Sequence, residues 1–165
     1  MKKVFLSLLF LLTAGIFQVM ADDEAQFGMV TENPANNYVD FFFNGFTFKI
    51  PQGMPVNMEG TEATIKNTNG TFGVSIKSEK DANASAQGAY GICQRAVTDL
   101  HLIEAKLTKV NINGLEGAVV EGKLEGTNVA IEVLNGGKKY LKTIIIYDDS
   151  NLSQAKTILT SIKKD

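Results

Sequence analysis

The sequence has few of the residues on which most catalytic and metal centres depend. Its 165 residues include one cysteine, one histidine and no tryptophan. A single cysteine excludes an internal disulfide framework and a cysteine-rich zinc site, and a single histidine excludes any site that needs two imidazoles. Basic residues are not in excess either, because 16 lysines and arginines face 18 aspartates and glutamates, for a formal net charge of −2. This balance argues against a nucleic-acid partner, whose phosphates need neutralising cations.

Long hydrophobic runs are also scarce, and the one that is present lies at the start of the chain. Two lysines precede an apolar stretch over 4–20, and Ala21 is followed by the acidic cluster Asp22–Glu24. A positive end, an apolar middle and a small-residue exit are typical of a secretory signal peptide. We predict a signal peptide over 1–21, cleaved between Ala21 and Asp22, and a secreted or periplasmic location. The alternative is an uncleaved anchor, but the run is short for a hydrocarbon core of ~30 Å.

The rest of the chain divides into a short leader and one domain. Residues 22–37 are acidic and asparagine-rich with few apolar side chains, so we predict a flexible leader there. Residues 38–165 are long enough for a single domain with one core, and apolar residues make up 44% of the whole sequence. No further long apolar run follows, so we expect no membrane span in the mature chain.

Asn-Gly pairs are the clearest local signal in the predicted domain. Both residues tolerate positive φ, which the two-residue turn of a β-hairpin requires. Each pair lies between apolar or β-branched residues, so four pairs predict four hairpins and about eight strands. The run Ile144–Ile146 is apolar on both faces and is predicted to be a central, covered strand. The pairs are Asn44–Gly45, Asn69–Gly70, Asn113–Gly114 and Asn135–Gly136, in hairpins over 38–50, 61–78, 105–124 and 128–148.

The strand register follows from placing each Asn-Gly pair in a two-residue turn. In the first hairpin, a turn at Asn44–Gly45 brings six apolar residues onto one face, which must then be buried, and sets Asp40 opposite Lys49 on the other face. In the fourth hairpin the same rule sets Glu132 opposite Lys139. The six apolar residues of the first hairpin are Val39, Phe41, Phe43, Phe46, Phe48 and Ile50.

Two segments have helical periodicity. Over 83–102 apolar residues recur at spacings of three and four, and Asn83 or Ser85 can cap the start. Over 151–164 the same spacing recurs, and Lys163–Lys164 suit the negative end of a helix. The order of four strands, a helix, four strands and a helix predicts an α+β fold, an antiparallel sheet of about eight strands with two helices packed against it.

A family resemblance adds to this pattern. Residues 48–51 read Phe-Lys-Ile-Pro at the end of an opening hairpin, and a helix precedes Ile112–Gly114. A long strand to Ile146 and a final helix with Ile158 and Leu159 follow. On these features the domain resembles the PsbP-like superfamily of α/β sandwiches, a fold shared with the Ran-binding Mog proteins and the bacterial DcrB-like proteins. The resemblance implies a small secreted or accessory domain that binds other proteins or assemblies, in a family whose members are mostly not enzymes, and no catalytic residue can be carried over because no matching motif exists.

Three aromatic side chains are candidates for a binding surface. Phe42 lies between two core phenylalanines on the opposite face of the first hairpin, where it is expected to be exposed. Together with Tyr38 and Tyr140, Phe42 would make an apolar patch if the fold brought the three side chains together. We predict no metal site and no cofactor, because no spacing of ligand-type residues is diagnostic.

Cys93 and His101 are the remaining candidates for chemistry. Cys93 falls on the apolar stripe of the first predicted helix, which favours a small buried hydrophobe. A nucleophile paired with His101 is disfavoured, because eight residues of helix separate the two by about 12 Å. An intermolecular disulfide is a third interpretation, since an unpaired cysteine in an exported protein has no internal partner.

Taken together, these features favour a non-enzymatic exported domain that acts through a protein partner and uses no cofactor. An alternative is a domain that binds a small apolar ligand between sheet and helix. A third hypothesis is a hydrolase whose carboxylates come from separate strands.

Overall fold

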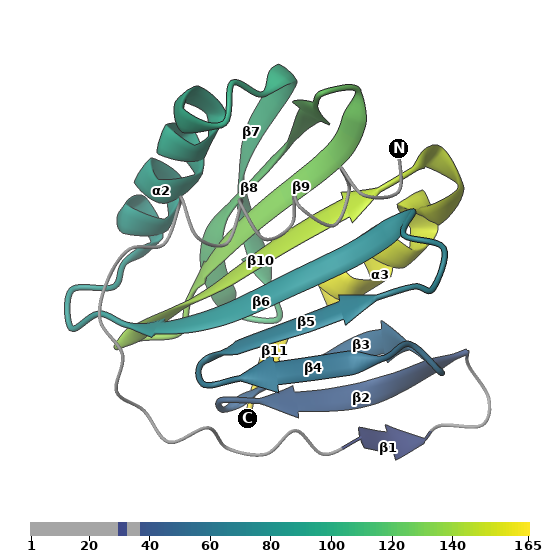
Figure 1. Cartoon of the computed structure of the whole chain (residues 1–165). Coiled ribbons are helices and arrows are strands. Elements are labelled where there is room, and N and C mark those ends of the chain that lie inside the picture. The colour runs from purple at the N-terminus through teal and green to yellow at the C-terminus, as the bar shows by residue number, and fades with distance from the viewer. Residues whose placement is uncertain (1–29, 33–36) are drawn as a thin grey trace.

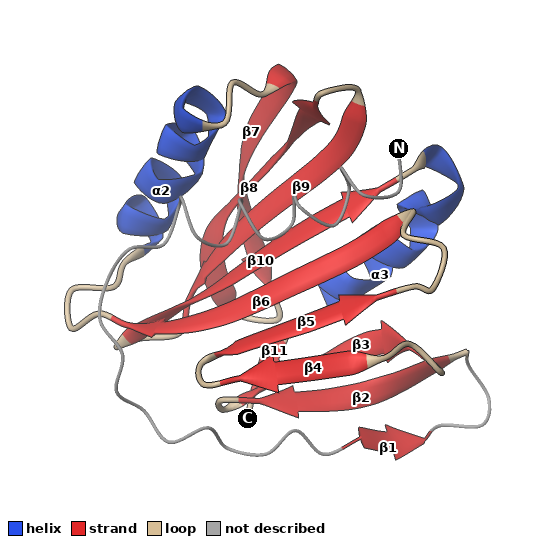
Figure 2. Ribbon diagram, viewed as in Figure 1, coloured by secondary structure: helices blue, strands red, loops and turns tan. Residues whose placement is uncertain are grey.

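The computed structural model describes residues 30–32 and 37–165. The predicted signal peptide over 1–21 and most of the predicted leader lie outside these ranges. Within them the chain forms eleven strands, arranged in two antiparallel sheets, and two α-helices (Figures 1 and 2). The predicted α+β fold is confirmed, with the strands divided between two sheets that pack face to face.

The smaller sheet contains the predicted first hairpin, and its register is confirmed in full. Asp40 lies opposite Lys49, and their side chains form an ion pair of 3.1 Å. All six apolar residues predicted to share a face are at most 4% exposed. Residues 30–32, within the predicted leader, form an edge strand. The order is β1-β2-β3-β11, with β1 Val30–Glu32, β2 Tyr38–Phe43, β3 Phe46–Pro51 and β11 Lys163–Lys164.

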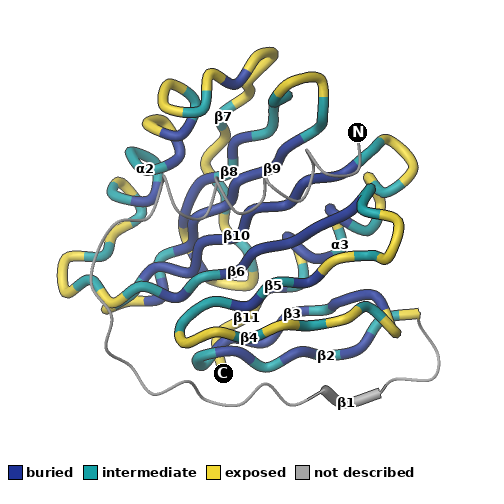
Figure 3. Tube along the Cα trace, viewed as in Figure 1, coloured by how far each residue is buried: buried dark blue, intermediate teal, exposed yellow. Residues whose placement is uncertain are grey.

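The larger sheet has seven strands, with β10 at its centre. Ile144, Ile145 and Ile146 are each at most 1% exposed, which confirms the prediction of a central covered strand. Burial is densest along β6, β10 and β9, between the layers (Figure 3). The order is β4-β5-β6-β10-β9-β8-β7, with β4 Val56–Glu59, β5 Glu62–Lys66, β6 Phe72–Lys80, β7 Ile103–Ile112, β8 Leu115–Leu124, β9 Thr127–Asn135 and β10 Lys139–Tyr147.

One predicted register is wrong. Glu132 lies opposite Thr143 rather than Lys139, because the β9–β10 hairpin closes at the pair Asn135–Tyr140, which leaves four residues, 136–139, between the paired strands instead of two. Gly137 takes the positive φ of 99°, and its N–H donates to Asn135 Oδ1 at 2.9 Å, which settles the longer loop. The change of register moves Glu132 away from a cation.

Two helices cover opposite faces of the larger sheet. Helix α2, Ala86–Asp99, packs against β7, β8 and β9, and its N-cap Ser85 accepts a hydrogen bond from the Gly88 N–H at 3.0 Å. Helix α3, Leu152–Ser161, follows the short 3-10 helix η1, Asp149–Asn151, and packs against β3 and β10 (Figure 1). The molecule therefore has two cores, one under α2 and one shared by the two sheets and α3.

The end of the chain differs from the prediction. Lys163 and Lys164 were expected to end the last helix, but α3 stops at Ser161 and the two lysines form β11 against β3. Ile162 turns to an extended conformation, with ψ of 129°, and is 1% exposed. Burial of that side chain in the core between the sheets redirects the backbone, and pairing with Thr47 then completes the strand.

Candidate functional site

The three aromatic residues predicted to form a patch lie on different parts of the molecule. Tyr38 and Phe42 are half-buried on the outer side of β2, opposite the face that meets the larger sheet. Tyr140 is 4% exposed in the core under α2, and its hydroxyl accepts a hydrogen bond from the Ser85 N–H at 3.1 Å. The structure does not bring Tyr140 to the other two, and a binding role for Tyr38 and Phe42 stays a prediction.

Cys93 is buried, as predicted. It is 0% exposed, and its Sγ lies 3.4 Å from the Ala118 carbonyl of β8, so the thiol packs against the larger sheet. Burial, followed by the nearby charge of Glu132, raises the pKa of Cys93 to about 12. His101 is exposed beyond the end of α2 and does not accompany the thiol. A neutral, covered thiol is a poor nucleophile.

Cys93 is therefore expected to react with a thiol reagent only when the protein opens. At about pH 8 we expect labelling of the folded chain to be at least about 100-fold slower than in denaturant, because both burial and protonation protect the sulfur. Thr98→Cys in a Cys93→Ser background, at an exposed position of the same helix, serves as the fast-reacting control. Rapid labelling of the folded wild type would contradict the buried assignment.

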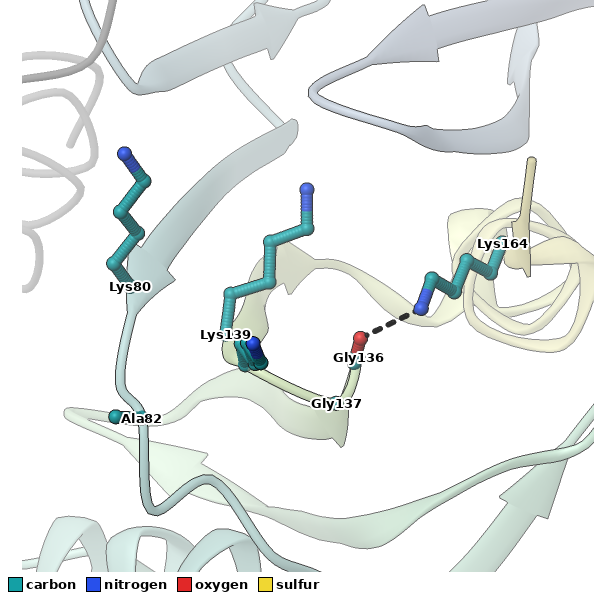
Figure 4. A pocket seen from close by; sticks show the side chains of 7 residues that line it. Lys80, Ala82, Gly136, Gly137, Lys139 and Lys164 are labelled. Carbon is teal, nitrogen blue, oxygen red and sulfur yellow. Dashed lines mark hydrogen bonds between the residues drawn. The ribbon is translucent and has the colours of Figure 1, made fainter.

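A pocket of about 620 Å³ lies where the end of β6, the β9–β10 loop and β11 meet (Figure 4). Lysines from all three segments line it, although the chain as a whole carries a net charge of −2. This lysine pocket is lined by Lys80, Ala82, Gly136, Gly137, Lys138, Lys139 and Lys164.

Hydrogen bonds hold the walls of the lysine pocket together. Lys164 Nζ donates to the Gly136 carbonyl at 3.0 Å, and Lys139 Nζ donates to the carbonyl of Asn44 in the β2–β3 turn. Lys139 also lies over the ring of Phe46, 5.1 Å from its centre. Gly136 is required at this junction, because a Cβ there would lie 2.6 Å from Phe46 Cζ. The two sheets and the end of the chain are thus joined at the pocket.

The donors of the lysine pocket are side-chain ammonium groups rather than backbone amides. The Gly136 N–H donates to the Lys139 carbonyl at 2.8 Å, and the Gly137 N–H to Asn135 Oδ1 at 2.9 Å. Both amides are therefore occupied and do not form a phosphate-binding nest. In Figure 4, Lys80 and Lys139 extend on one side of the loop, and Lys164 reaches Gly136 from the other. The arrangement suits an extended ligand with several negative charges.

The sequence interpretation missed this site. Lys138 and Lys139 are adjacent to the Gly-Gly pair of the loop, and this was the one local signal for it. Lys80 and Lys164 join them only through the pairing of β6 with β10 and of β11 with β3.

Two classes of feature are absent from the part of the chain that the structure describes. Over residues 30–32 and 37–165, no group of three or more His, Cys, Asp or Glu side chains is placed to hold a metal ion. Within the same ranges, neither helix has the length and apolar character needed to cross a bilayer.

Comparison with solved structures places the fold beside two other proteins. A crystal structure from Bacteroides thetaiotaomicron matches with a TM-score of 0.50 and 14% identity. The match covers 73% of this chain and 45% of that one. The solution structure of cyanobacterial PsbP (CyanoP) from Synechocystis matches with a TM-score of 0.48 and 10% identity, covering 92% of this chain and 100% of that one. No protein-family model and no curated protein matches the sequence. At 14% identity, the match to the Bacteroides structure is a likeness of fold alone.

Proposed function

We propose that this chain is an exported, non-enzymatic domain that binds an acidic segment of another exported protein in the lysine pocket. The observation that carries the proposal is the convergence of four lysines, from three separate segments, on one pocket of a chain that is acidic overall. Such a local reversal of charge attracts and orients an acidic partner. The positive end, apolar run and small-residue exit at the start of the sequence support export.

The chemistry of the pocket favours an acidic peptide over a single phosphate. Lysine ammonium groups are point charges on flexible stems, whereas planar, bidentate recognition of phosphate is the usual role of arginine. The volume of about 620 Å³ is in the range of pockets that hold extended ligands. Two acids stand near the rim: Asp81 follows Lys80, and Asp165 follows Lys164, with its carboxylate bonded to Thr47.

The other two hypotheses find no comparable support. The space between α2 and the larger sheet is filled by small side chains, Ala89, Cys93 and Ala96, each at most 1% exposed. An apolar ligand would have to displace this packing. A carboxylate hydrolase needs two acids at one cleft, and the pocket described above is lined by cations.

Neutralising two pocket lysines is expected to weaken binding of an acidic peptide. Titration of a hexaglutamate peptide into the full chain, followed by NMR chemical shifts, should show changes centred on the loop 136–138 and β11. In Lys138→Gln/Lys164→Gln the dissociation constant is expected to rise about tenfold, and its salt dependence to become shallower, because two cations are lost.

The matched control is Lys66→Gln/Lys106→Gln, which removes two exposed lysines outside the pocket and changes the net charge equally. This variant should bind as the wild type does. Equal weakening in both variants would show a diffuse charge effect and would contradict a defined site. Absence of shifts at the pocket at low salt would refute the proposed function.

A further inference from the structure

One oxygen of a buried carboxyl group in the larger sheet has no hydrogen-bond partner. Glu132 is 1% exposed in the middle of β9, and its Oε2 is unpaired. Thr143 lies directly opposite on β10, 1% exposed, and its hydroxyl is unpaired as well. Buried polar atoms without partners are rare in folded proteins, and each one calls for an explanation.

The surroundings of Glu132 are apolar and belong to α3 and the sheets. Its neighbours on the same face of β9, Ala130 and Leu134, are in one buried cluster with Ala155 and Ile158 of α3. Its partner on the other side, in β8, is Val119. A charge at this place would be shielded from solvent, and burial accordingly raises the pKa of Glu132 to about 8.

The titratable groups nearest to Glu132 do not compensate for its charge. From α2, the buried thiol of Cys93 interacts with it through the sheet, and that thiol is neutral. On the same faces of the strands, β8 contributes Glu121 and β10 contributes Tyr147, which are respectively an acid and a phenol. The α3 residues buried in this core are apolar, and Lys156 of that helix is exposed. The phenylalanines of the smaller sheet complete the enclosure.

We infer that Glu132 is a proton-operated switch for the lysine pocket: protonated, it lets α3 and β9 pack closely, and ionised, it loosens them. This inference rests on the proposed function for its consequence in binding. Two chain connections lead from Glu132 to the pocket. Strand β9 continues from Glu132 into the loop 136–138, and α3 continues through Ile162 into Lys164. Loosening either element separates Lys164 from Gly136 and so breaks the 3.0 Å hydrogen bond from Lys164 Nζ to the Gly136 carbonyl.

The test combines peptide binding with hydrogen exchange on the full chain at about pH 6.5 and about pH 9. The non-titrating variants at position 132 separate the effect of Glu132 from any other effect of pH on the attraction between pocket and peptide. In the wild type, affinity for hexaglutamate is expected to fall about fivefold or more at the higher pH. Protection factors of amides in α3, and of Gly136 and Asp165, are expected to fall in parallel.

Glu132→Gln should show neither change, because the amide resembles the protonated acid and cannot ionise. Glu132→Leu is a second non-titrating variant, and Glu121→Gln is the control for an acid on the same face of the sheet. If the affinity and protection of Glu132→Gln fall as those of the wild type do, the switch is refuted. If protection falls in the wild type alone but hexaglutamate binds at neither pH, the switch is supported and the proposed function fails.

Discussion

Glu132→Gln is expected to be more stable than the wild type at alkaline pH, by several kcal/mol in the free energy of unfolding. The wild type must hold an ionised carboxylate in a core with no partner for Oε2, whereas the variant places a neutral amide there. At acidic pH the wild-type side chain is itself neutral, so the two proteins should unfold with similar free energies.

The sign of this pH dependence follows from the proton affinities of Glu132 in the folded and unfolded chains. Burial raises the pKa of Glu132 from 4.5 to about 8, so between these values the folded protein binds more protons than the unfolded chain. The contribution of Glu132 to the free energy of unfolding is fully present below pH ~4.5 and is lost as the pH rises through ~8. It does not return at higher pH. Each tenfold difference in proton affinity is worth about 1.4 kcal/mol, so the loss is on the order of 5 kcal/mol.

Urea unfolding at several pH values between about pH 4 and about pH 9 measures this effect. The midpoint of the wild type should fall steadily over the range, while that of Glu132→Gln should change far less. Glu116→Gln, at an exposed position on β8, provides the control and should follow the wild type. Parallel curves for Glu132→Gln and the wild type would show that the carboxyl group has an ordinary proton affinity.

The first hairpin was predictable in detail because three independent signals coincide there. The Asn44–Gly45 turn, the apolar face and the Asp40–Lys49 pair all require one register. Slipping the register by one residue would expose the phenylalanines, so no competing arrangement satisfies the pattern. The turn at Asn113–Gly114 is similarly well defined, since both residues take positive φ as predicted.

The β9–β10 register could not be obtained in the same way. Gly136 and Gly137 offer two positions for positive φ, and the observed loop differs from the predicted one by an even shift in pairing. An even shift leaves every side chain on its own face, so the alternation of apolar residues does not distinguish the two registers. The burial pattern is thus right while the partner of Glu132 is wrong. The unusual carboxyl group was visible only in the structure.

The lysine pocket escaped prediction for a different reason. Its lysines are brought together by contacts between elements, and β11 forms from a Lys-Lys pair with no intrinsic preference for a strand. The backbone pairing with β3 stabilises the extended conformation of these two lysines, which their own propensity does not favour. Alternation along β10, in contrast, already places Tyr140 on the same face as Ile144 and Ile146, the face under α2. That pattern was sufficient to remove Tyr140 from an exposed patch.

The largest single destabilisation is expected at Gly117 of β8, which pairs with Leu134 of β9. A Cβ at this position would lie 2.1 Å from the Val133 carbonyl oxygen and 3.0 Å from Leu134 Cα, both of them backbone atoms. Backbone atoms in a ladder cannot move aside without breaking its hydrogen bonds, and β8 is held by β7 on its other side. Gly117→Ala should therefore lower the free energy of unfolding by more than about 3 kcal/mol, beyond the usual cost of overpacking.

Gly91→Ala is the matched control and should have the opposite sign. The added Cβ would meet only Arg95 Nη1, at 3.8 Å, and alanine is favoured over glycine inside a helix by about 1 kcal/mol. Thermal unfolding of both variants measures the difference, with circular dichroism to show whether Gly117→Ala folds at all. Because the clash involves two strands of the larger sheet, a Gly117→Ala protein as stable as the wild type would mean that β8 and β9 are paired differently from the register described. That pairing also places Glu132 between Val119 and Thr143, so the same measurement tests the strand register on which the proton switch depends.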